Sequence, residues 1–144
     1  KKRLAAYVKE SPEAQLLQTI PGIGVLLAQV ILAEIGTLAR FSSPGKLSSY
    51  AGLVPSLHQS GQTLYHGPCP QQGNKFLRWA LVEAAQTAVR KDPLLKAFYD
   101  RIKRKKGSQK AVVAAARKMS VIVFHILSKK EPYRYSAFPQ VSPA

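Results

Sequence analysis

The fold is decided by residues 109–128, which read QKAVVAAARKMSVIVFHILS. Apolar side chains recur in this stretch in alternating steps of four and three residues, which is the spacing of one face of an α-helix. This seam consists of Val112, Ala116, Met119, Val123 and Ile126. The basic residues lie away from it, at Lys110, Arg117 and Lys118. The pattern predicts a long helix whose apolar seam is buried in a protein core.

A second helical stripe runs through residues 74–90. Its apolar members follow one another at i, i+4, i+7, i+8 and i+11, and they are Leu77, Leu81, Ala84, Ala85 and Ala88. Between the two stripes, residues 93–106 have the pattern of a helix that ends in a run of bases. We expect the stripes of 74–90 and 109–128 to form the core together.

Helix boundaries are marked by capping residues. A serine or aspartate followed by proline is typical of a helix start, and it occurs at Ser11-Pro12, Ser43-Pro44 and Asp92-Pro93. Glycines stand where helices would end, at Gly36, Gly52 and Gly107. The sequence therefore predicts a mainly α, single helical domain over residues 11–133. Residues 1–10 resemble the end of a linker helix from an upstream domain, and residues 134–144 resemble a tail.

One long stretch, residues 53–73, has no helical period. It is rich in helix-breaking residues, namely Pro55, Gly61, Gly67, Pro68, Pro70 and Gly73. Loops of this length are uncommon inside a compact domain and usually carry function. The apolar residues Val54, Leu57, Leu64 and Tyr65 leave room for a short β-hairpin. We therefore expect one long irregular loop in an otherwise helical domain.

Charge is the strongest compositional feature. The 144 residues include 22 Lys and Arg against 7 Asp and Glu, which gives a net charge of +15. The excess is concentrated in residues 73–144, which hold sixteen bases and four acids. A field of this sign attracts polyanions, and nucleic acid is the usual one. A membrane partner is not expected, because no apolar run reaches the ~18 residues of a spanning helix and no basic helix carries aromatic anchors.

The chain offers few metal ligands. Its single cysteine, Cys69, excludes a disulfide framework and fits a reducing cytoplasm. His66 and Cys69 make a pair of candidate ligands, but a four-ligand zinc site needs more partners than the sequence supplies. The seven acids are scattered and predict no two-metal carboxylate cluster. We therefore expect no metal site in this chain, so metals for any phosphoryl transfer must be held outside it.

The sharpest local motif is Ile20-Pro21-Gly22-Ile23-Gly24, which resembles the helix-hairpin-helix nucleic-acid module. In such a hairpin, glycines allow backbone N–H groups at the start of the second helix to approach one phosphate. The motif makes Gly22, Ile23 and Gly24 candidate nucleic-acid contacts. The alternative is a corner between two helices in which the glycines serve packing alone.

A candidate nucleophile lies in the long loop, in Gln59-Ser60-Gly61. A serine hydroxyl becomes reactive only beside a base or a cation that stabilises its alkoxide. His58 shares a face with Ser60 if the loop is extended there, because strand residues at i and i+2 point the same way. The alternatives are that Ser-Gly is only a turn and that His58 is only a surface residue.

Taken in order, several short motifs resemble one known family. They are Ile20-Pro21-Gly22-Ile23-Gly24, Arg40-Phe41, Tyr50-Ala51-Gly52-Leu53-x-Pro55, Gln59-Ser60-Gly61, Gly73-Asn74-x-x-Leu77-Arg78, Ala84-Ala85, and Phe98-Tyr99 before a basic run. The set resembles the C-terminal transposase domain of the DEDD-type insertion-sequence transposases, the family that includes the bridge-RNA-guided serine recombinases. The resemblance covers about residues 12–133.

The resemblance implies a DNA-recombination enzyme of a mobile element. Ser60 matches the family's nucleophilic serine, which forms a covalent phosphoserine link with DNA so that strands rejoin without ATP. Mg²⁺ would be held by four acids of an upstream RuvC-like domain, and the isolated chain would be inactive. Further implied partners are a guide (bridge) RNA and a second copy of the protein, in the cytoplasm of a bacterial or archaeal cell. The stretch 62–72 departs from the family, which tends to be basic there.

Within this interpretation, the bases that follow the long loop and those in the helix predicted over residues 93–106 are candidate phosphate contacts. Lys75 and Arg78 follow the loop directly, and Arg101, Lys103, Arg104, Lys105 and Lys106 would bind backbone more remotely. Two other interpretations stay open. One is a non-enzymatic helix-hairpin-helix module that only binds nucleic acid, and the other is a structural RNA-associated protein such as a ribosomal component.

Overall fold

A computed structural model describes residues 11–54 and 73–134. These residues form six α-helices and one 3₁₀ turn, which are α2 (Pro12–Gln18), α3 (Val25–Ile35), η1 (Leu38–Arg40), α4 (Pro44–Tyr50), α6 (Lys75–Lys91), α7 (Pro93–Lys106) and α8 (Ser108–Lys129). The described residues contain no strand, which confirms the mainly α fold class. The β-hairpin considered for residues 53–73 falls almost wholly outside them.

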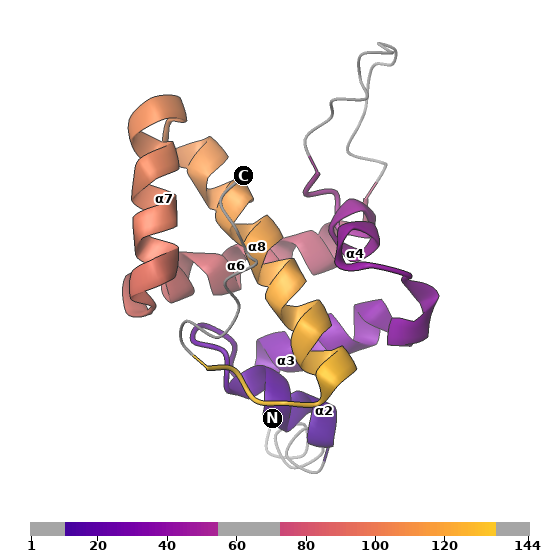
Figure 1. Ribbon diagram of the computed structural model, residues 1–144. Helices are drawn as coiled ribbons and strands as arrows, with labels where there is room; N and C mark the ends of the chain where they lie inside the picture. Colours follow the sequence, from indigo (N-terminus) through magenta and orange to yellow (C-terminus); the bar gives the residue numbers. More distant parts are fainter. Residues whose placement is uncertain (1–10, 55–72, 135–144) are drawn as a thin grey trace, which may run out of the picture.

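The long helix α8 is the centre of the fold. It packs against α2, α4, α6 and α7, and Figure 1 shows it crossing the middle of the molecule between α7 and α4. Met119, Val123 and Ile126 are fully buried, as the spacing predicts. Val112 is only half-buried. The seam therefore forms the core along most of α8 and opens toward solvent near its start.

The stripe on α6 faces the same core. Its five apolar members, Leu77, Leu81, Ala84, Ala85 and Ala88, are all at most 1% exposed. Three of these are alanines, whose small side chains let neighbouring helices approach closely, and α3, α7 and α8 all pack on this helix. The expectation that the two stripes form one core is confirmed, and the α2–α3 hairpin adds Leu17, Ile20 and Ile23 to it.

The predicted caps set the helix boundaries. The Ser11 hydroxyl accepts from the backbone N–H of Ala14 at 3.2 Å, and the Ser43 hydroxyl accepts from Lys46 at 3.4 Å. The Asp92 carboxylate accepts from the N–H of Leu94 at 3.0 Å, so α6 and α7 meet at this residue. Each cap satisfies a backbone donor that the first helical turn leaves unpaired.

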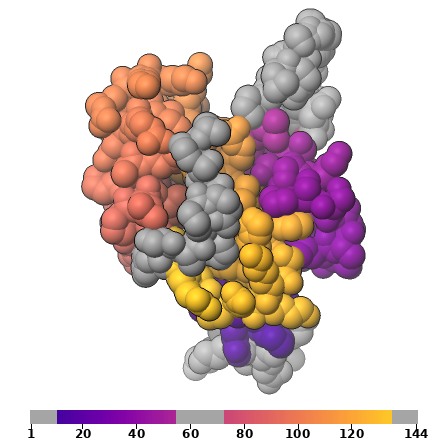
Figure 2. All heavy atoms as spheres, viewed as in Figure 1, coloured from indigo at the N-terminus to yellow at the C-terminus, as the bar shows by residue number. Residues whose placement is uncertain are grey.

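Polar contacts fasten distant parts of the chain to one another. Inside the core, the hydroxyls of Ser48 on α4 and Ser120 on α8 are 2.6 Å apart and hydrogen-bonded. After α8, the Tyr133 hydroxyl donates to the buried Asp92 carboxylate, and the Tyr133 N–H donates to the Thr19 hydroxyl at 2.8 Å. In Figure 2 the surface around the end of α8 (yellow) meets that of α2 (indigo). These hydrogen bonds fasten Tyr133 to the end of α2 and to the junction of α6 and α7.

By length and composition alone, α8 is apolar enough to cross a membrane. Half of its most apolar stretch is buried inside the protein, however. Because its seam packs on four other helices, we interpret α8 as a core helix.

Candidate nucleic-acid interface

The hairpin between α2 and α3 uses its two glycines differently. Gly22 has φ +100°, and a Cβ there would overlap the carbonyl oxygen of Ala84 and lie 3.1 Å from the nitrogen of Ala88. The backbone of α6 therefore occupies the space in which a side chain would sit. The missing side chain of Gly22 serves packing on α6.

Gly24 faces solvent at the start of α3. It is exposed, and a Cβ there would meet nothing within 4 Å. Between the glycines, the Ile23 side chain is 4% exposed and its N–H donates to the Ile20 carbonyl at 3.1 Å. No side chain of the described residues caps α3. The backbone N–H groups that the hairpin can offer to a phosphate are therefore those in the first turn of α3, directly after Gly24.

Replacing Gly24 by aspartate tests this end of α3. Aspartate is a good N-cap, so the fold should keep or gain stability, but its carboxylate would occupy the place of a phosphate. We expect Gly24→Asp to weaken duplex DNA binding several-fold, measured by fluorescence anisotropy.

The matched control is Gly24→Asn, which caps α3 equally well without a charge. It should bind DNA more tightly than the aspartate variant. Equal affinity of the aspartate variant and the wild-type protein would leave the hairpin with a packing role only.

The two described ends of the segment that holds Ser60 lie side by side. The Asn74 N–H donates to the Tyr50 carbonyl at 2.7 Å. Gly73 lies against Gly52 so closely that a Cβ on Gly73 would be 2.6 Å from the Gly52 Cα. We call residues 50–54 together with Gly73 and Asn74 the stem. It fixes where the chain leaves the core and where it returns.

A polar cluster fastens the stem to the end of α3. The Asn74 side chain caps α6 by accepting from Leu77 N–H at 2.9 Å, and its Nδ2 donates to Glu34 at 2.7 Å and to the Tyr50 hydroxyl at 3.2 Å. The Arg40 guanidinium lies 4.9 Å from the Tyr50 ring centre. Hydrogen bonds from Asn74 and then Arg40 lower the pKa of Tyr50. The cluster joins three of the motifs that the sequence singled out.

The two bases after the long loop have different positions. Arg78 is half-buried and donates to the Ala51 carbonyl at 3.4 Å, so it braces the stem. Lys75 is exposed at the start of α6, with its ammonium 5.7 Å from the centre of the Phe76 ring. Both lie in the first turn of α6, and their role as phosphate contacts stays a prediction.

A groove of about 680 Å³ opens between α7, α8 and the stem. Its basic lining residues are Arg101, Lys105, Lys106, Lys110 and Arg117. The stem contributes Gly52, Leu53 and Val54. No Asp or Glu is among the described residues that line it. This groove, which we call the basic groove, is a concave surface of one charge sign at the base of the segment that carries Ser60.

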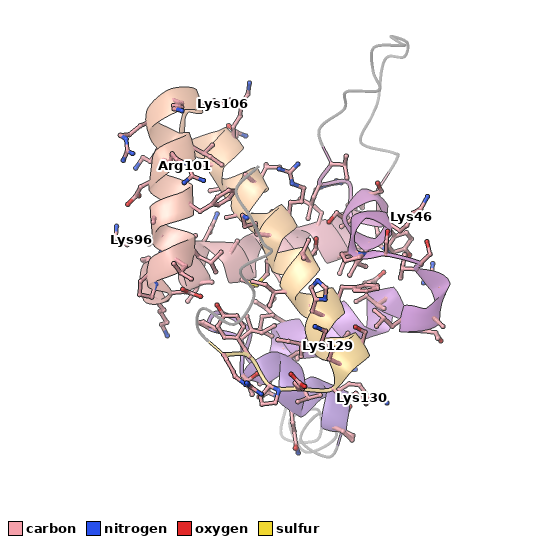
Figure 3. All side chains as sticks on the ribbon, in the orientation of Figure 1. Lys46, Lys96, Arg101, Lys106, Lys129 and Lys130 are labelled. Carbon is pink, nitrogen blue, oxygen red and sulfur yellow. The ribbon has the colours of Figure 1, made fainter. Side chains whose placement is uncertain are left out.

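The structure divides the basic run that the sequence singled out. Arg101, Lys105 and Lys106 line the basic groove, whereas Lys103 and Arg104 do not. Lys103 packs instead by the Tyr99 ring, at 5.9 Å from its centre. Figure 3 shows Arg101 and Lys106 together on α7, far from Lys129 and Lys130 at the other end of α8.

Sequence reasoning missed the α8 side of the groove. Lys110 and Arg117 were recognised only as bases lying off the seam, but they line the basic groove. Their separation by seven residues places them on one face of a helix. Arg101 and Lys105 on α7 are four residues apart, which also places them on one face of a helix. The spacing of these two pairs of bases is visible in the sequence. That the two pairs line one groove is visible only once α7 packs on α8.

Lys118 lies beside the groove lining. Its ammonium is 4.4 Å from the centre of the Phe98 ring. Partial burial, followed by the nearby charges of Arg101 and Arg117, lowers the pKa of Lys118 to about 8. An anion bound to those two arginines would offset their field and favour the charged lysine.

Nucleic-acid affinity should therefore fall as the pH rises through about 8. Binding of the nucleic acid raises the pKa of Lys118, so the Lys118 amine takes up a proton when the complex forms. Proton uptake costs more free energy as the pH rises, and binding weakens accordingly. Between pH 7 and pH 9 we expect a loss of roughly three- to tenfold in affinity. Lys118→Arg, which keeps its charge over this range, should flatten the profile. An unchanged slope in that variant would contradict the assignment.

Residues 14–100, more than half of the chain, match the family described as the transposase IS116/IS110/IS902 family. The chain belongs to this transposase family. The match covers the α2–α3 hairpin, the stem and α6, so it confirms the resemblance to insertion-sequence transposases that the motifs indicate.

Individual proteins that are similar to the chain agree with this. The chain is 33% identical over 142 residues to the transposase for insertion sequence element IS1111A of Coxiella burnetii, which covers 93% of the chain and 38% of that protein. It is 34% identical over 123 residues to the pilin gene-inverting protein of Moraxella bovis, at 83% and 38% coverage. It is 26% identical over 137 residues to a probable family 20 transposase of Pseudomonas aeruginosa, at 92% and 40%. The chain thus spans about two fifths of each relative.

The candidate chemistry residues of the long loop lie outside the described residues. They are His58, Ser60, His66 and Cys69. Within residues 11–54 and 73–134, no group of three or more His, Cys, Asp or Glu is placed to hold a metal ion.

Proposed function

We propose that this chain is the DNA-contacting part of a transposase that cuts and rejoins DNA through a phosphoserine at Ser60. The observation that carries the proposal is the position of the basic groove. Its lining includes stem residues 52–54, which lead directly into the segment that holds Ser60. A DNA backbone held by the groove cations would lie at the root of that segment. The relatives named as transposases and as a gene-inverting protein support the same function.

The chemical step is a phosphoryl transfer. The Ser60 hydroxyl oxygen attacks the phosphorus of a DNA phosphodiester, and the bond from phosphorus to the leaving sugar oxygen breaks. The serine gives up its proton, and the leaving oxygen takes one up as a hydroxyl. In the reverse sense, a sugar hydroxyl attacks the phosphoserine and restores Ser60. One phosphoester replaces another at each step, so joining needs no external energy source.

This chain's own contribution is binding and positioning. The cations of the basic groove neutralise the DNA backbone, and the stem holds both ends of the Ser60 segment at a fixed place. We propose that Mg²⁺ is held by an upstream RuvC-like domain of the same polypeptide, as the resemblance to the insertion-sequence transposases implies. A homo-oligomer and a guide RNA belong to the same proposal.

The test uses the whole transposase polypeptide that contains this chain, with Mg²⁺ and DNA carrying the ends of its element. We expect a protein–DNA adduct that survives denaturing electrophoresis. Strand cleavage without any adduct would overturn the phosphoserine. DNA binding without cleavage would favour the non-enzymatic module instead.

A companion measurement tests the division of the site. The 144-residue chain alone should bind DNA but leave it uncut in the presence of Mg²⁺. Metal-dependent cleavage by this chain alone, with a purified preparation and a Ser60→Ala control, would refute an active site shared with another domain.

A further inference from the structure

The lining of the basic groove is apolar as well as cationic. Its apolar side chains, which we call the floor, are Leu53, Val54, Phe98, Ile102, Val113 and Ala114, and we call its cations the rim. Val113 is 40% exposed, and it is one of five large apolar side chains that the structure shows as exposed. Contacts to a phosphate backbone require only cations and hydrogen-bond donors. The apolar floor therefore indicates a second kind of contact.

Aromatic packing holds part of the cationic rim in place. The Phe98 ring is 9% exposed, with the Lys118 ammonium 4.4 Å and the Arg101 guanidinium 5.6 Å from its centre. Such contacts restrict the long side chains that carry the charges. The exposed apolar surface that a ligand can reach is consequently on the α8 side, around Val113, with Ile102 opposite.

The size of the groove limits its occupant. A volume of about 680 Å³ lies in the range of roughly 300–1,000 Å³ typical of sites that enclose a single small molecule. One or two nucleotides fill such a space, and the side of a duplex does not enter it. A duplex also keeps the apolar faces of its bases stacked inside, where the floor would not reach them.

We propose that the basic groove binds a single-stranded stretch of nucleic acid, with an unpaired base against Ile102 and Val113 and the adjoining phosphates on Arg101, Lys105 and Arg117. This inference rests on the proposed function, and it adds the form in which the nucleic acid is bound. Strand exchange requires DNA to be unpaired near the cut, so a single strand next to the stem fits that chemistry. Single-strand binding sites typically combine a cationic groove with aromatic platforms for the bases, and here the aliphatic side chains of Ile102 and Val113 take the place of the platform.

The test compares three fluorescent probes of equal length, which are an oligothymidylate, an abasic strand with the same phosphates, and a duplex. Anisotropy is measured with the 144-residue chain. We expect the oligothymidylate to bind several-fold more tightly than the abasic strand, because the apolar face of one base is buried against aliphatic side chains. Equal affinity for these two strands would overturn the proposal, and so would a preference for the duplex that persists in Gly24→Asp, in which duplex binding at the hairpin is weakened.

Variants separate the floor from the rim. Val113→Ser should reduce the preference for the base-bearing strand, and Val121→Ser, the same change on α8 outside the groove, should not. Lys105→Gln should weaken binding to both single strands by the same factor. If Val113→Ser left the preference unchanged, the floor would have no role. An acidic peptide of matched charge that bound as tightly as the oligothymidylate would indicate a protein partner instead.

The outcome is distinguishable from that of the proposed function. Adduct formation by the whole transposase depends on Ser60, whereas the preference for a base-bearing strand depends on Val113 and Ile102. Loss of the adduct with a retained preference would overturn the phosphoserine alone. A normal adduct with no preference would overturn only the single-strand groove.

Discussion

Ser60→Ala is expected to abolish the covalent protein–DNA adduct of the whole transposase. Alanine has no oxygen to attack phosphorus, so no phosphoester to the protein can form. The variant should still bind DNA within a few-fold of the wild-type affinity, because the basic groove and the hairpin lie elsewhere in the chain. The adduct is measured by denaturing electrophoresis with labelled DNA, and binding by anisotropy.

Ser56→Ala is the matched control, since it makes the same change four residues earlier in the same segment. It should retain the adduct. An adduct that persists in Ser60→Ala would show that another residue is the nucleophile. Loss of the adduct in both variants, with loss of binding, would show that the segment itself is sensitive to substitution.

Gly22→Ala is expected to destabilise the fold by about 3 kcal/mol or more. The positive φ of +100° contributes strain of roughly 1–3 kcal/mol for a residue with a side chain. Overlap of the new methyl with the carbonyl of Ala84 adds a further roughly 1–3 kcal/mol, because the backbone of α6 cannot move aside cheaply. Urea unfolding followed by circular dichroism measures the difference in free energy of unfolding.

Gly107→Ala is the control for strain without overlap. Gly107 has φ +96°, but a Cβ there would meet nothing within 4 Å. Its cost should be about 1–3 kcal/mol, from the backbone conformation alone. If Gly22→Ala were no more destabilising than Gly107→Ala, a methyl group at position 22 would have room beside the Ala84 carbonyl, and the close packing of the hairpin on α6 would be contradicted.

The helices and the core were predictable because their signals are local. Capping by Ser11, Ser43 and Asp92 depends on residues within three positions of each cap, and the seam of α8 is visible from its spacing. The fold class follows from such patterns. Val112 is the instructive departure, since it continues the seam in sequence but lies where α8 extends beyond most of the core.

The candidate site was only partly predictable because it depends on which helices are neighbours. The basic run on α7 is evident in the sequence, but its division into groove-lining and outward-facing bases is decided by the position of α8. The role of Gly22 depends in the same way on α6, which lies about sixty residues further along the chain. Ser60 was reached through family resemblance, since Ser-Gly alone is a common turn.

The closure of the stem has a consequence for the stability of this domain. Eighteen residues, 55–72, join two backbone positions that are already held together by the Tyr50–Asn74 hydrogen bond and the Gly52–Gly73 contact. Doubling the length of an insert between such fixed ends costs only about 0.6 kcal/mol in chain entropy. The free energy of folding of this domain should therefore depend little on the length of the segment between these two positions.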